Sequence, residues 1–200
     1  MSLLDYTVIV IMTLILIIGI YQFYFWCQRH PFRPAIEFNS KIDAWFSLKP
    51  AWIWIYSGLY YPIIVFMVAS FKDMRHFNYT VLSFFILLVF QMIFFVFFPV
   101  KTPDHWRGSL TGSSLTHRFM RYVQKLDKSS NCFPSMHVSV STLTALHLFY
   151  NLPALGYWIL FFPVLIAISA LFTKQHYFWD LIPRAALGGS CFKIYEVLYL

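Results

Sequence analysis

The fold is decided by residues 133–180, which read FPSMHVSVSTLTALHLFYNLPALGYWILFFPVLIAISALFTKQHYFWD. The part from 138 to 173 has no charged residue and is too long for one membrane crossing of about 20 residues. Helix-breaking residues interrupt it at 151–156, NLPALG. We therefore expect two helices, roughly 134–151 and 154–173, joined by a tight turn that returns the chain to the side on which it started.

The rest of the chain also has the composition of a membrane protein. Of its 200 residues, 60% are hydrophobic and 12% are charged, about half the charged fraction of a soluble domain. Further uncharged stretches of sufficient length are 6–28, 50–71 and 77–100. The last stretch, 181–200, holds three charged residues but also small residues that let helices pack closely. We predict one domain, 1–200, with an all-α fold: a polytopic membrane bundle of about six transmembrane helices.

Six crossings would place the loops 29–49, 101–133 and 174–180 on one side, and these loops hold most of the basic residues. The positive-inside rule would put them in the cytoplasm, unless the cations instead bind phosphate or anionic head groups. The net charge of +7 does not indicate nucleic acid, because the cations lie between apolar spans and no nucleic-acid-binding motif is present. We expect the partners to be the membrane and an anionic lipid or phosphate.

The string TKQHYFWD at 173–180 contains the first candidate catalytic pair, His176 and Asp180. Ionisable residues at a membrane boundary are costly to place and usually functional. Four residues apart on a helix, the two would share a face. The carboxylate would then fix the tautomer of the imidazole and leave its other nitrogen free to attack. A purely structural hydrogen-bonded pair is the alternative.

The string FPSMH at 133–137 contains the second candidate histidine, His137. Pro134 suits the first turn of a helix, whose free N–H groups and partial positive charge favour phosphate. Ser135 adds a hydroxyl donor there, and His137 is placed to protonate a leaving oxygen. The hairpin between the two strings would bring His137 and His176 to one surface. An ordinary N-cap with an interfacial histidine is the alternative.

Four cations are candidate substrate-binding residues. Lys174 is close in sequence to His176 and would counter phosphate charge. Arg184 follows Asp180 by four residues and would either point the same way or extend to the interface. Lys101 and Arg107 come just after the third apolar stretch and would complete an anion pocket.

These strings resemble the signature motifs of the type 2 phosphatidic acid phosphatase superfamily. Its motifs read Pro-Ser-(usually Gly)-His and, later, Ser-Arg, five residues, His, three residues, Asp; here they fall within 99–184. The TKQHY string is most similar to the branch that contains inositol phosphorylceramide synthases. The resemblance implies a six-helix fold, an extracytoplasmic site and a mechanism that needs no metal or other cofactor.

The resemblance also implies roles for individual residues. His176 would be the nucleophile that forms a phosphohistidine, Asp180 would orient it, and His137 would act as general acid and later as base. Ser135 and Lys174 would hold phosphate oxygens. Ala170 stands where the superfamily has arginine, so another cation must bind phosphate there, and Met136 replaces the usual glycine.

We therefore expect a membrane lipid phosphatase or lipid phosphotransferase that acts on a lipid phosphate ester, with water or a lipid or alcohol acceptor taking the phosphoryl group. A metal site made of His137, His176 and Asp180 is an alternative within enzymology. A serine nucleophile at Ser135 is disfavoured, because the flanking glycines of a nucleophile elbow are missing. Outside enzymology, the alternative is a non-catalytic membrane scaffold or lipid-binding protein.

Overall fold

The computed structural model describes residues 1–38, 40–107, 110–127 and 131–199. This part of the chain contains seven α-helices and several short 3₁₀ or π-helical turns, so the all-α prediction is confirmed. The α-helices are α1 (Leu3–Arg29), α2 (Tyr60–Phe66), α3 (Met74–Phe97), α4 (Leu115–Leu126), α5 (Met136–Asn151), α6 (Phe161–Phe172) and α7 (Leu181–Tyr199). The turns are η1 (Lys41–Trp45), η2 (Pro50–Trp52), η3 (Trp54–Leu59), η4 (Met67–Ser70), η5 (Asp104–Trp106), η6 (Pro153–Leu160) and η7 (Phe178–Asp180).

Among the residues that the structure describes, four helical segments are long and apolar enough to cross a membrane: Leu3–Arg29, Pro50–Ser70, Met74–Phe97 and Pro153–Phe172. The protein is therefore a multi-pass integral membrane protein. In α1, for example, large apolar side chains such as Leu14, Ile15 and Ile18 are exposed. Such an apolar surface is stable in contact with lipid and not in contact with water. α5 and α7 are shorter or less apolar, and the prediction of about six crossings stays a prediction.

The expected helical hairpin is confirmed. α5 is the first arm, and η6 continuing into α6 is the second. Within η6, Gly156 adopts φ 52°, a left-handed conformation that glycine tolerates because it has no Cβ. The hairpin returns the chain to the end of the bundle from which α5 begins.

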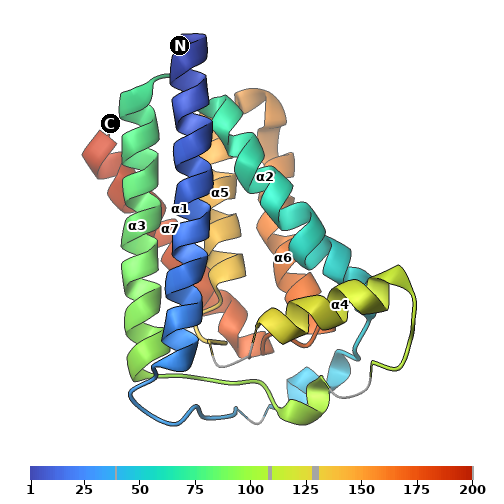
Figure 1. Cartoon of the computed structure of the whole chain (residues 1–200). Coiled ribbons are helices and arrows are strands. Elements are labelled where there is room, and N and C mark those ends of the chain that lie inside the picture. The colour runs from blue at the N-terminus through green and yellow to red at the C-terminus, as the bar shows by residue number, and fades with distance from the viewer. Residues whose placement is uncertain (39, 108–109, 128–130, 200) are drawn as a thin grey trace.

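α5 lies inside the bundle and contacts α2, α3, α6 and α7. Figure 1 shows both termini at one end of the bundle, and α4 with the long connecting loops at the other end. The three basic loops meet there: the backbone N–H of Lys49 donates to the carbonyl of Phe172, and Val100 pairs with both Ile36 and Asn131. The three loops therefore lie on the same side of the bundle, as predicted. Helix α4, by contrast, was not predicted from the sequence.

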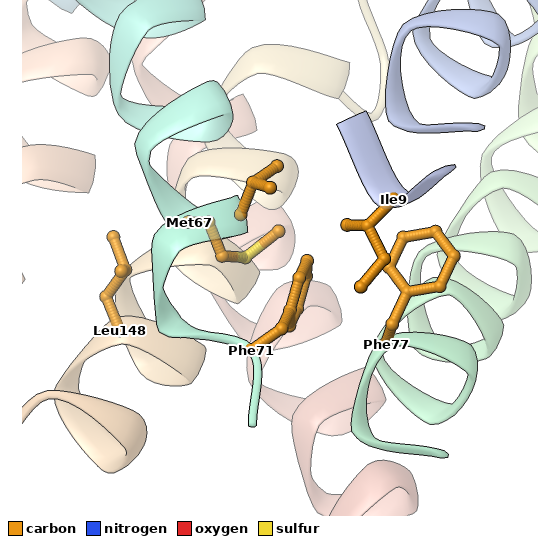
Figure 2. Close-up of a cluster of buried hydrophobic side chains, with 6 residues drawn as sticks. Ile9, Met67, Phe71, Phe77 and Leu148 are labelled. Carbon is orange, nitrogen blue, oxygen red and sulfur yellow. The ribbon is translucent and has the colours of Figure 1, made fainter. Parts of the chain in front are cut away.

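Near the end that carries the termini, a buried apolar cluster joins the helices (Figure 2). Ile9 of α1, Met67 and Phe71 at η4, Phe77 of α3 and Leu148 of α5 pack together there. Because lipid is as apolar as these side chains, such contacts stabilise the bundle through close packing rather than through exclusion of water. The polar residues of the candidate site lie at the opposite end.

α7 approaches the backbone of α5 at Gly188. A Cβ added at Gly188 would lie 2.5 Å from the carbonyl oxygen of Ser139 and 3.0 Å from Cβ of Thr142, whereas one added at Gly189 would meet nothing within 4 Å. Small residues allow such close helix contacts inside a membrane. The packing of α7 on α5 therefore requires glycine at position 188 but not at position 189.

Gly188→Ala is expected to destabilise the protein by about 1–3 kcal/mol, because the methyl group forces α7 away from α5. Gly189→Ala is the matched control and should leave stability unchanged or slightly higher, since alanine favours helix. Thermal unfolding of the detergent-purified variants measures both effects. Equal unfolding temperatures for the two variants would contradict this account of the α5–α7 contact.

Candidate active site

His176 lies buried in a non-helical segment between α6 and η7. Its Nδ1 is 3.1 Å from the carbonyl oxygen of Cys132, and its Nε2 is 2.8 Å from Oγ of Ser135. Since a carbonyl oxygen only accepts hydrogen bonds, Nδ1 carries the hydrogen and Nε2 has the free lone pair. Nε2 is therefore the nitrogen of His176 that is able to attack an electrophile.

Asp180 does not orient His176 in the way the sequence suggested. The prediction that the two share a helical face is wrong, because the chain between α6 and η7 is not helical. The carboxylate of Asp180 instead accepts from the backbone N–H of Tyr177 at 3.2 Å and pairs with Arg184 at 2.5 Å. The backbone carbonyl of Cys132 fixes the His176 tautomer.

Ser135 and His137 lie at the start of α5. Ser135 is the N-cap residue, but its hydroxyl makes no capping bond and contacts His176 instead. His137 lies in the first turn of α5, and its Nδ1 is 3.0 Å from the hydroxyl of Tyr56. The same hydroxyl is 3.3 Å from Nε2 of His176, so the two predicted histidines meet through Tyr56.

The sequence analysis missed Tyr56. Its ring stacks on His137, with centroids 4.2 Å apart and an interplanar angle of 25°. It belongs to η3, a π-helical turn of the kind often found at functional sites. In the sequence it is one of several aromatic residues in an apolar stretch, and nothing there distinguishes it from a packing residue.

Arg184 and Arg107 are the predicted cations that lie near His176. Arg184 is fully buried and donates to the carbonyl of Cys132; its Nε and Nη1 have no partner among the described residues. Arg107 donates to Oε1 of Gln175 at 2.6 Å and to the carbonyl of Asp127. Positive charge is thus supplied from α7 and from the loop after α3.

Lys174 and Lys101 have other partners. Nζ of Lys174 donates to the carbonyl of Asp43 at 2.6 Å and lies 4.4 Å from the ring centre of Trp106. Lys101 forms a 3.0 Å ion pair with Glu37. Both ammonium groups therefore tie loops together at this end of the bundle.

Burial controls the protonation of the site. Burial, the neighbouring Arg184 and His137 lower the pKa of His176 well below its ordinary value of 6.5. Burial also raises the pKa of Asp180 to about 6, while Arg184 and the Tyr177 N–H oppose that rise. At neutral pH His176 is therefore an uncharged imidazole, and Asp180 is mostly ionised beside Arg184.

One cavity adjoins His137, and a second cavity lies next to the first. The first, of about 390 Å³, is lined by Tyr56, His137 and Asp127 together with side chains of α1 and α4. The second, of about 90 Å³, is lined almost entirely by apolar groups of α1, α2, α3 and α5. Tyr21 and Tyr61 line both cavities, and their hydroxyls are 2.7 Å apart.

The profile of the PAP2 superfamily matches residues 35–193, most of the chain and every predicted site residue. The chain belongs to the PAP2 superfamily. The superfamily consists of metal-independent phosphatases, so this PAP2 protein carries a phosphatase-type site. The resemblance seen in the sequence is thus confirmed at the level of the superfamily. Comparison with curated proteins and with solved structures yields no match. Within the described ranges, no three His, Cys, Asp or Glu side chains form a group able to hold a metal ion.

The contribution of His176 to the stability of this PAP2 protein should fall as the pH is lowered below about 6.5. An unfolded His176 binds a proton near pH 6.5, whereas the buried one binds it only at lower pH, so acid favours the unfolded chain. The stabilising contribution is complete above pH 6.5 and is lost as the pH falls toward the pKa of the folded state. Thermal unfolding between pH 7.5 and about 5 should show a shallower decline for His176→Asn than for wild type; identical slopes would contradict the assignment.

Proposed function

We propose that this PAP2 protein is a membrane lipid phosphatase or lipid phosphotransferase that works through a phosphohistidine on His176. The observation that carries the proposal is the meeting of the buried His176 and the partly buried His137, from opposite ends of a helical hairpin, at one tyrosine hydroxyl beside a buried arginine. The superfamily membership supports a phosphate ester as substrate. The remaining steps follow from the chemistry of these side chains.

In the first step, Nε2 of His176 attacks phosphorus and forms an N–P bond as the bond to the leaving oxygen breaks. The leaving oxygen takes the electron pair of the broken bond and a proton from protonated His137. Nδ1–H of His176 stays bonded to the Cys132 carbonyl, which stabilises the positive charge that the ring gains. Ser135, freed from Nε2, donates its hydroxyl hydrogen to a phosphoryl oxygen.

Arg184 supplies the main positive charge for the phosphoryl group in this proposal. Its Nε and Nη1 are buried donors without partners among the described residues, which is costly unless an anion or water completes them. The Asp180 carboxylate holds the guanidinium in place from its other side. Arg184 thus takes the role that the superfamily pattern gives to an arginine at position 170, where this chain has the buried Ala170.

The other predicted cations contribute less directly. Arg107 is held beside Gln175 and would add to the positive potential around His176. Phosphate-binding roles for Lys174 and Lys101 stay predictions, since reaching the phosphoryl group would require each to leave its present partner.

In the second step, water or an acceptor alcohol attacks phosphorus and transfers its proton to His137. The N–P bond breaks, and its electron pair returns to Nε2. The larger cavity, which reaches His137 and Tyr56, is the natural site for the attacking molecule. A transferase of the inositol phosphorylceramide synthase type would bind its acceptor there, and mass analysis of the products distinguishes transfer from hydrolysis.

The smaller cavity supports a lipid substrate. It lies between helices that cross the membrane, and its lining is apolar along Leu16, Ile17 and Ile20 of α1. Because it shares Tyr21 and Tyr61 with the larger cavity, a head group near His137 would have its hydrocarbon chain at membrane depth. A soluble phosphate ester would leave this apolar space without an occupant.

The proposal includes about six membrane crossings. Both termini lie at the same end of the bundle, which requires an even number of passes (Figure 1). α5 and α7 then cross in addition to the four apolar segments, with Arg184 buried against Asp180 rather than facing lipid.

Incubation with ³²P-labelled lipid phosphate should label the wild-type protein through an acid-labile, alkali-stable bond. His176→Asn should abolish both labelling and turnover, since asparagine keeps a donor to the Cys132 carbonyl but has no nucleophilic nitrogen. His137→Asn should slow turnover by about 10²–10⁴-fold, because the general acid and base is lost. His30→Asn, on an exposed loop, is the control. If wild-type protein turns over no member of a broad panel of lipid phosphates, the scaffold alternative is favoured.

Ile17→Trp should raise KM for a long-chain lipid phosphate about tenfold, because indole fills the space proposed for the hydrocarbon chain. The same variant should hydrolyse a short-chain soluble phosphate ester as well as wild type does. Ile18→Trp is the matched control, since Ile18 is 61% exposed on the adjoining surface of α1. An equal effect of Ile17→Trp on both substrates would exclude a chain site in this cavity.

A further inference from the structure

Tyr56 holds the only phenol hydroxyl, among the residues that the structure describes, within hydrogen-bond distance of both His137 and His176. Its side chain is buried, and it packs with Ile53, Met120 and Ala170. The ring is clamped against His137 on one face and lies 6.3 Å from the ring of His176. The position of the hydroxyl is therefore set by packing on the ring and not by the hydroxyl itself.

The positions of the hydrogens around Nε2 of His176 are constrained. The Cys132 carbonyl requires the hydrogen of His176 on Nδ1, so Nε2 of His176 must accept from a neighbour. Ser135 and Tyr56 are the hydroxyls within reach of Nε2, at 2.8 Å and 3.3 Å. The Tyr56 hydroxyl has one hydrogen and two acceptor lone pairs, so it is able to donate to one histidine while it accepts from the other.

We propose that Tyr56 is a positioning residue that accepts a hydrogen bond from Nδ1–H of protonated His137 and donates its own hydrogen to Nε2 of His176. This arrangement stabilises the acid form of His137 in a buried site, where an imidazolium without an acceptor is costly. It also places the second proton of His137 on Nε2, from which the leaving oxygen takes it. The role rests on the proposed function, in which His137 is the general acid.

The same hydroxyl links the two steps of the reaction. Once Nε2 of His176 bonds to phosphorus, it no longer accepts a hydrogen bond, and the hydrogen of Tyr56 is released. At that moment His137 has given up its Nε2 proton to the leaving oxygen but keeps Nδ1–H, which still donates to the Tyr56 oxygen, so the Nε2 lone pair of His137 is free to act as the base. The Tyr56 hydroxyl thus contacts the acid form of His137 before phosphoryl transfer and its base form afterwards, without movement of the ring.

Other groups around His137 affect the same equilibrium. Burial disfavours the charged form of His137 most strongly, the Asp127 carboxylate favours that form, and the Arg184 guanidinium opposes it. Neutral His176 lies on the far side of the Tyr56 hydroxyl, and the Tyr60 ring of α2 packs on His137 at 4.6 Å. The hydroxyl of Tyr60 bonds neither histidine in the described part of the chain, so Tyr60 is a matched comparison.

Tyr56→Phe removes the hydroxyl and keeps the stacked ring. We expect kcat to fall about 10- to 100-fold, the effect of losing a hydrogen bond to a charged group, with KM changed less than about twofold. The basic limb of the pH–rate profile should move about one unit lower, because the acid form loses its acceptor. Tyr60→Phe should leave that limb in place. A Tyr56→Phe enzyme with the wild-type limb and kcat would overturn the proposal.

A second measurement does not depend on turnover. In protein with ¹⁵N-labelled histidine, Tyr56→Phe should shift the Nδ1 resonance of His137 and the Nε2 resonance of His176, whereas Tyr60→Phe should shift neither. Unchanged resonances would exclude the hydroxyl bridge even if the protein turned over no phosphate ester. Conversely, shifted resonances in a protein without turnover would place the error in the proposed function and not in the bridge.

If the phenylalanine variant does not fold, 3-fluoro- and 3,5-difluorotyrosine at position 56 replace it. Fluorine makes the phenol oxygen a weaker acceptor and its hydrogen a better donor. The basic limb should then move lower with each fluorine if Tyr56 accepts from His137. A limb that stays in place or moves higher would overturn that direction of the hydrogen bond.

Discussion

The carbonyl oxygen of Cys132 accepts hydrogen bonds from both His176 and Arg184, and the rest of the site depends on this one atom. A carbonyl has two lone pairs and no hydrogen, so it imposes one tautomer on the imidazole and brings the guanidinium to the same point. The lone pair of His176 is consequently on Nε2, and Nε and Nη1 of Arg184 are left without partners among the described residues. Because the acceptor belongs to the backbone, its position is set by the chain path before α5 and not by any side chain at 132.

The helical bundle makes that arrangement possible. α5 and α6 form a hairpin whose two ends deliver Ser135 with His137 and, after a short non-helical segment, His176. α7 adds Arg184 and packs on α5 closely enough to require Gly188. The ionisable groups of the candidate site are thus collected at one end of the bundle, whereas the other end is joined by the apolar cluster around Phe71 and Phe77. Such a division suits a site at a membrane surface, where burial makes each polar interaction stronger.

Particular residues show how far sequence reasoning extends. The two histidine strings, the hairpin between them and the superfamily could be predicted, because apolar length and local motifs are properties of neighbouring residues. The partner of Asp180 was predicted incorrectly, since helical spacing was assumed across a segment that is not helical. Lys174 was the phosphate-binding cation preferred from the sequence. Only the folded structure shows that Arg184 has two donors without partners among the described residues, whereas the charges of Lys174 and Lys101 are satisfied by other loops. No feature of the sequence pointed to Tyr56, because it is distinguished only by its contacts with residues about 80 and 120 positions away.

The sequence by itself determined that the chain is helical and crosses a membrane, because uncharged stretches of this length can satisfy their backbone groups in lipid only as helices. It also singled out His137 and His176 as candidates, since an imidazole at the edge of an apolar run has a solvation cost that requires a reason. Only the tertiary structure decided which nitrogen of His176 is free, which cation stands beside it and which hydroxyl joins the two histidines. Those are matters of direction and distance between segments remote in sequence, and they are fixed only when the helices pack against one another.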